Sequence, residues 1–131
     1  MSTKYKFRDN DRLYFVSFAV VDRIDLFIRM EYCEIMLDSI RFCQINKGLE
    51  LYAWCIMSSH IHLLMGSNQH KMEDIMRDLK SHTSRELKKA IKNNATESRK
   101  EWMLKLMQEA GEKNSNNKNF QLWLKIITHW K

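Results

Sequence analysis

The hydrophobic positions along the chain change their spacing several times, and each change marks an expected element. Three short stretches rich in β-branched and aromatic residues predict strands at residues 12–21, 49–57 and 60–66. The pair Ser58 and Ser59 predicts a tight turn, so the second and third strands should be antiparallel neighbours. Alternate side chains of a strand share a face, so His60 and His62 should project together while Ile61 enters the core.

Apolar residues three and four positions apart predict helices over residues 30–46, 71–93 and 96–110. Gly48 follows the first helix and Gly111 is expected to end the third. Residues 120–124 alternate again and predict a last strand. The order β-α-β-β-α-α-β is that of an α+β, ferredoxin-like domain with an antiparallel sheet and an extra helix before the last strand. In that topology helices cover one face of the sheet, and the histidine pair should lie on the open face.

Composition supports one soluble domain over residues 1–131. The apolar share is 44%, proline is absent, and no apolar run is long enough to span a bilayer. No membrane association is expected, and the default location is cytoplasmic. The odd set Cys33, Cys43 and Cys55 predicts reduced core thiols rather than disulfides.

The charge of the chain favours a polyanionic partner without requiring one. The net charge is +6 and the pI is near 9.3. Five basic residues of the helix at 71–93 could hold a phosphate backbone: Arg77, Lys80, Arg85, Lys88 and Lys89. An ordinary solvated face of mixed charge is an equal alternative. Trp54, Trp102 and Trp123 could stack on bases, although burial is the better default for a tryptophan.

His60 and His62 would supply half of a site for a divalent cation, and two surface histidines are the alternative. Such a cation could polarise a phosphodiester. Candidate carboxylate ligands are Asp22, Asp25 and Glu50, of which Glu50 is the least remote. Three isolated histidines should lie on the surface: His70, His82 and His129.

Residues 57–64 read Met-Ser-Ser-His-Ile-His-Leu-Leu, which resembles the His-hydrophobe-His signature of the HUH tyrosine transposases. These are insertion-sequence and REP-associated enzymes, and they typically carry Met-Pro-Asn-His-Val-His-Leu-Leu at this place. Residues 14–18, 52–57, 77–84, 110–114 and 120–123 are also similar. The resemblance implies a ferredoxin-like fold, an Mg²⁺ or Mn²⁺ ion on His60 and His62, and single-stranded DNA flanked by hairpins as partner. It further implies transposition, with a tyrosine on a C-terminal helix attacking the scissile phosphate.

The nucleophile of that family has no match in this chain, so no catalytic residue is assigned. The tyrosines are Tyr5, Tyr14, Tyr32 and Tyr52, and all of them precede the histidine pair. One possible set of codons for residues 124–131, read in a shifted frame, gives Lys-Asp-Asn-His-Pro-Leu-Glu, which is similar to the family. We therefore expect a frameshifted, truncated transposase in which the nucleophile helix is missing and cleavage is absent or impaired.

Three other functions stay open at this point: a module that only binds structured DNA, a phosphodiesterase that uses metal-activated water, and an inert remnant. Loss of a C-terminal segment could expose apolar surface. A homodimer is therefore also an expected state.

Overall fold

The computed structural model describes residues 13–114 and 119–130, the last four of them by their backbone. Four strands form one antiparallel sheet in the order β2-β3-β1-β4. Their bounds are Tyr14–Ala19 for β1, Leu49–Ile56 for β2, His60–Ser67 for β3 and Ile127–Trp130 for β4. The helices are Met30–Asn46 for α1, Met72–Asn93 for α2 and Lys100–Glu112 for α3, and the short 3₁₀ turns η1 (Val21–Arg23) and η2 (Leu26–Ile28) precede α1. This is the expected ferredoxin-like α+β architecture.

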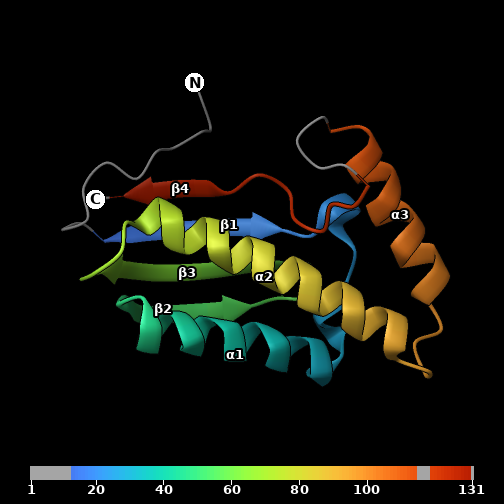
Figure 1. Ribbon diagram of the computed structural model, residues 1–131, viewed down its shortest axis with the longest axis horizontal. Coiled ribbons are helices and arrows are strands. Elements are labelled where there is room, and N and C mark those ends of the chain that lie inside the picture. The colour runs from blue at the N-terminus through green and yellow to red at the C-terminus, as the bar shows by residue number, and fades with distance from the viewer. Residues whose placement is uncertain (1–12, 115–118, 131) are drawn as a thin grey trace.

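Helices α1 and α2 lie side by side across one face of the sheet (Figure 1). Alternation in β3 directs Ile61, Leu63 and Met65 toward these helices, where all three are fully buried. Helix α2 meets them with an apolar stripe that includes Met76 and Leu79. The opposite face of the sheet has no helix on it in the described part of the chain, so side chains there are open to a ligand.

The last strand lies later in the chain than the sequence pattern predicts. Residues 120–124 make a single bridge, Val20 to Trp123, and the strand β4 is Ile127–Trp130, paired with β1. The alternation at 120–124 has a different cause. Leu122 and Trp123 fill the core, while backbone hydrogen bonds tie this segment to Val21 and Ala19.

Helix α3 begins four residues later than predicted, because Glu97 belongs to a buried ionic cluster. Its carboxylate accepts hydrogen bonds from Arg29 Nε at 2.6 Å, Arg99 Nε at 2.9 Å and the Tyr32 hydroxyl at 3.0 Å. Burial alone would raise the pKa of Glu97, but these donors lower it from its ordinary 4.5 to about 2. The cluster therefore joins the turn before α3 to the start of α1.

Gly111 lies inside α3 and does not end it. A Cβ at this position would collide with the backbone nitrogen of Phe120. Because glycine has no Cβ, the backbone at Phe120 can pack directly against α3 at this position.

Candidate functional site

The histidines of β3 lie on the open face of the sheet. His60 and His62 are half-buried, and Ile61 between them points into the core. Their ring centroids are 4.9 Å apart and the rings are nearly perpendicular, at 88°. The two imidazoles are therefore close enough to reach one small ligand between them.

Each histidine is oriented by a serine. Ser17, opposite His62 on β1, places its hydroxyl oxygen 2.7 Å from His62 Nδ1. Ser59 places its hydroxyl oxygen 3.3 Å from His60 Nδ1. With each Nδ1 engaged, the Nε2 atoms are the ring nitrogens left for a ligand, and second-shell bonds of this kind fix the tautomer of metal-binding histidines.

The surroundings of His62 favour its neutral form. Burial lowers its pKa, and the neighbouring His60 lowers it further. The ring of Phe15 stacks parallel to that of His62, with centroids 5.6 Å apart and an angle of 8°. A neutral, immobilised imidazole is the form that binds a metal ion.

The hairpin that carries the pair is anchored by the connection from β1 to α1. Val20 N donates to the Ser59 carbonyl and Phe27 N to the Ser58 carbonyl, both at 2.9 Å. The Ser58 hydroxyl also donates to Asp25 at 2.8 Å. The start of β3 is consequently fixed on both sides of the turn.

None of the three candidate carboxylates completes a site with the histidines. Glu50 pairs opposite Gly66, six residues from His60, or about 20 Å along the strand. Asp25 is engaged by Ser58, and Asp22 is exposed in the connection after β1. Among the side chains of residues 13–114 and 119–126, no group of three or more His, Cys, Asp or Glu could hold a metal ion. The described residues therefore offer two imidazole nitrogens, one each from His60 and His62, as ligands for a metal ion.

The tyrosines of the described segments lie away from the histidines. Tyr14 and Tyr32 are buried in the core. Tyr52 is exposed on β2, but its hydroxyl donates to Glu50, at the far end of the strand pair. Tyr5 lies outside the described residues.

The five basic residues expected to bind DNA are not beside the histidines. They all belong to α2, which covers the face of the sheet opposite the histidine pair. Arg77 is bonded to Asp74 at 3.0 Å, Lys89 to Glu86 at 3.4 Å, and Arg85 to the Ser81 hydroxyl at 2.8 Å. Lys80 and Lys88 face the segment at 120–125 instead.

The solvent exposure of individual side chains tests several smaller expectations. Cys55 is exposed on β2 opposite His62 and is not a core thiol, whereas Cys43 is buried. Trp123 is buried and donates to Thr83, but Trp54 and Trp102 are exposed. His70 and His82 lie on the surface as expected, and the side chain of His129 lies outside the described part. Sequence reasoning missed Ser17, which register alone could have placed beside His62.

Comparison with known proteins agrees with this architecture. A family model described as "Transposase IS200 like" matches residues 14–115. No curated protein sequence matches the chain significantly. One similar solved structure is a REP-associated tyrosine transposase bound to a REP hairpin, with a TM-score of 0.63 and 12% identity, over 100% of this chain and 62% of that one. Another, assigned as a transposase from Deinococcus radiodurans R1, has a TM-score of 0.52 and 26% identity, over 69% of this chain and 68% of that one.

The chain thus spans under two thirds of the first of these structures, and that likeness concerns the fold. The family match is broader evidence, since it includes every strand and helix from β1 to α3. The family inferred from the His-Ile-His signature is confirmed. No helix in the described segments has both the length and the apolar character needed to cross a membrane. The chain belongs to the IS200-like transposase family.

Proposed function

We propose that this chain acts in DNA transposition by binding hairpin-flanked single-stranded DNA, with a divalent cation held by His60 and His62. The observation that carries the proposal is the paired imidazoles on the open face, each with Nδ1 engaged by a serine. Family membership supports a role in transposition, and the REP-associated neighbour is itself described as bound to a hairpin.

The donor chemistry fits a divalent cation. Two neutral imidazoles leave coordination positions for water and phosphate oxygens, a mixture that suits Mn²⁺ and, with more oxygen ligands, Mg²⁺. When bound, the cation would supply Lewis-acid polarisation of a phosphodiester. The protein's part is to engage both Nδ1 atoms, through Ser17 and Ser59, and to keep His62 as a neutral imidazole stacked against Phe15.

We further propose that these 131 residues bind DNA well and cleave it poorly. Of the described tyrosines, Tyr14 and Tyr32 are buried and Tyr52 is hydrogen-bonded to Glu50, away from the histidines. A hydroxyl must lie within bonding reach of the scissile phosphorus to attack it.

The test incubates the chain with a hairpin-flanked single strand and Mn²⁺, and resolves products under denaturing conditions. Mn²⁺-stimulated binding that is lost in H60A and H62A, without a covalent adduct, is the expected result. An adduct abolished by a Tyr→Phe change would show that the chain cleaves through a tyrosine, contrary to the proposal. Binding that is indifferent to both histidine variants and to Mn²⁺ would favour a plain DNA-binding module, and catalytic turnover without an adduct would indicate water as nucleophile.

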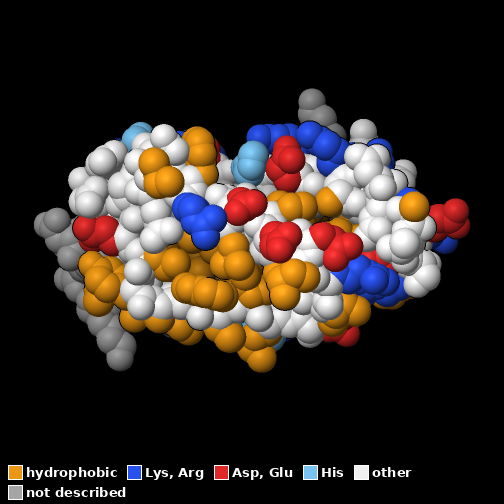
Figure 2. Space-filling view, turned by 90° about the horizontal axis from the view of Figure 1, so that it is seen from below, with side chains coloured by type: hydrophobic (Ala, Val, Ile, Leu, Met, Phe, Trp, Pro, Cys, Tyr) orange, Lys and Arg blue, Asp and Glu red, His pale blue; other side chains and the backbone are white. Residues whose placement is uncertain are grey.

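We also propose that the chain forms a homodimer through the exposed edge of β2. This strand ends the sheet, and large apolar side chains are exposed on it and on α1: Tyr52 and Trp54 from the strand, Phe42 and Ile45 from the helix. Figure 2 shows a broad gathering of hydrophobic side chains on the face that α1 and β2 share. A free strand edge can pair antiparallel with its own copy about a two-fold axis.

A further inference from the structure

Lys80 has no acidic partner among the described residues, whereas other cations of the helix layer are paired with carboxylates. Its side chain is half-buried, and Nζ donates to the carbonyl oxygen of Leu124 at 3.2 Å. By contrast, Lys47 reaches Asp78 at 3.0 Å and Arg77 reaches Asp74 at 3.0 Å. No carboxylate within residues 13–114 and 119–126 is within ion-pair distance of Lys80. An ammonium has three donors, so two remain for a ligand.

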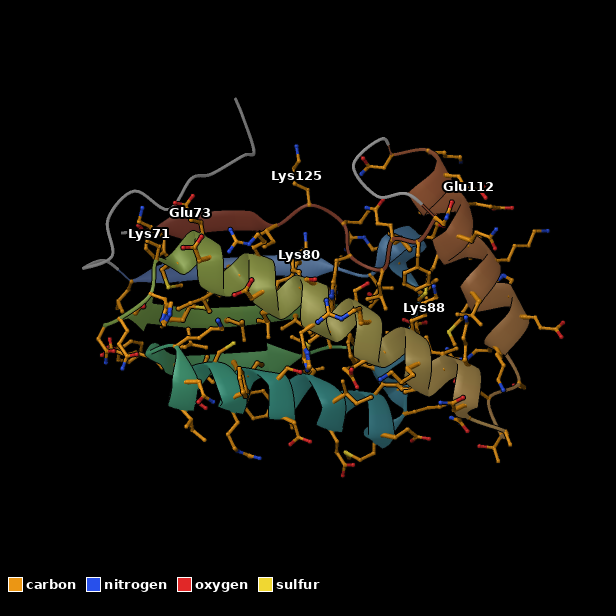
Figure 3. The ribbon with its side chains drawn as sticks, viewed as in Figure 1. Lys71, Glu73, Lys80, Lys88, Glu112 and Lys125 are labelled. Carbon is orange, nitrogen blue, oxygen red and sulfur yellow. The ribbon has the colours of Figure 1, made fainter. Side chains whose placement is uncertain are left out.

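A second positive charge lies beside it. Lys125 follows Leu124 directly, and Figure 3 shows the side chains of Lys80 and Lys125 extending in the same direction from α2 and from the segment before β4. Burial lowers the pKa of Lys80, and the charge of Lys125 lowers it further. Partial burial of Lys80 beside a second positive charge is unfavourable, and an anion bound between the two ammonium groups would relieve that cost.

The same flank of α2 extends this positive surface. Lys80 and Lys88 are eight residues apart, so they lie about 12 Å apart along the helix and about 80° apart around its axis. Lys88 is placed over the ring of Phe120, with Nζ 4.5 Å from its centroid, and therefore faces the same segment as Lys80. Cations spread along one segment over this distance suit an extended polyanion better than a small enclosed one.

We propose that Lys80 and Lys125 form a phosphate-binding site for a nucleic-acid backbone, on the helix side of the sheet and separate from His60 and His62. That the polyanion is DNA rests on the proposed function. Strand β4 is the edge of the sheet, and Lys125 precedes it, so DNA passing over this edge would reach both the lysines and the open face. Lysine is suited to such contacts as a point charge that accepts any base sequence.

The test titrates a labelled hairpin-flanked single strand with the full chain, by fluorescence anisotropy, between about 50 and 200 mM salt. The double variant K80Q/K125Q should lose about tenfold or more in affinity, and the slope of log affinity against log salt should flatten by about two. The matched control K92Q/K105Q removes two exposed lysines elsewhere on α2 and α3, and its slope should stay near that of the unchanged chain. The variant K80R/K125R should keep the affinity.

If K80Q/K125Q and K92Q/K105Q behave alike, the site is refuted even though the chain binds DNA. A second measurement separates this from failure of the proposed function. Inorganic phosphate is titrated into the ¹⁵N-lysine-labelled chain, and the Nζ resonances of Lys80 and Lys125 should move while those of Lys92 and Lys105 do not. Lack of any DNA binding together with these shifts would refute the proposed function and keep an anion site, whereas unmoved resonances would refute the site.

Discussion

Ser17 lies directly opposite His62 on the neighbouring strand, with its hydroxyl oxygen 2.7 Å from His62 Nδ1. If Nε2 is to bind a cation, Nδ1 must carry the proton and donate it to this hydroxyl. The serine therefore selects the tautomer in which His62 can act as a ligand. Removal of a residue that hydrogen-bonds a metal-binding histidine commonly weakens metal affinity by about 10- to 100-fold.

S17A should weaken Mn²⁺ binding by at least about tenfold, because His62 loses the acceptor that orients it. Titration calorimetry gives the affinity, and ¹⁵N shifts of the imidazole report the tautomer in the metal-free chain. S17T keeps the hydroxyl and should restore both. S98A, at an exposed position, is the control. Unchanged tautomer and affinity in S17A would show that the hydrogen bond has no orienting role.

Replacement of Glu97 by glutamine should destabilise the chain by about 3–5 kcal/mol, because Arg29 and Arg99 would lose their shared carboxylate. The free energy of unfolding from urea titration measures this. E101Q, which changes an exposed carboxylate in the first turn of α3, should cost far less. Equal losses in the two variants would mean that the cluster contributes little.

The same carboxylate predicts how stability depends on pH. The pKa of Glu97 is lower in the folded chain, about 2, than its ordinary 4.5, so the folded state holds the proton less tightly. This stabilisation, about 3 kcal/mol, is present above pH 4.5 and is lost as the pH falls toward 2. Unfolding titrations over this range should show a steeper acid loss for the unchanged chain than for E97Q. Parallel curves would contradict the assignment.

G111A should destabilise the chain although alanine is the better helix former. The added methyl group would collide with the backbone of Phe120, which cannot rotate away as a side chain could. We expect a loss of about 2 kcal/mol or more in the free energy of unfolding. The control is Q108A, at an exposed position of the same helix, and it should be neutral or stabilising. A more stable G111A would show that the return of the chain adjusts easily.

W54K should abolish self-association if the β2 edge forms the dimer, because a charge would have to be buried against its own copy. Light scattering over a range of concentrations gives the mass. W102K changes an equally exposed tryptophan on α3 and should leave the mass unchanged. If the unchanged chain is a monomer at all concentrations, or if only W102K loses the dimer, the β2 edge is not the dimer interface.

Much of the fold was predictable because the two periods of hydrophobic positions are clear in β3 and α2. The period of two in β3 places Ile61 inward and the histidines outward, and the stripe of α2 is equally regular. Residues 120–124 mislead because Leu122 and Trp123 are buried from an irregular segment, which alternation alone cannot distinguish from a strand.

The parts of the site that sequence could not supply depend on contacts between distant positions. Glu97 resembles a residue at a helix start, and its burial depends on Arg29, 68 positions earlier. The basic residues of α2 could be assigned to a helix, but the face of the sheet that this helix covers follows from packing. Ser17 carries no signal of its own until the register of β1 and β3 is known.

The two hydrogen bonds that the β1–α1 connection donates to the Ser58 and Ser59 carbonyls make the histidine hairpin observable without metal or DNA. Exchange of the Val20 and Phe27 amide protons with solvent requires these bonds to open. Slow deuterium uptake at these two amides would report that the hairpin is closed, and fast uptake in a variant would reveal a loosened turn before any loss of binding is measured. A defect in ligand binding can in this way be separated from a displaced hairpin.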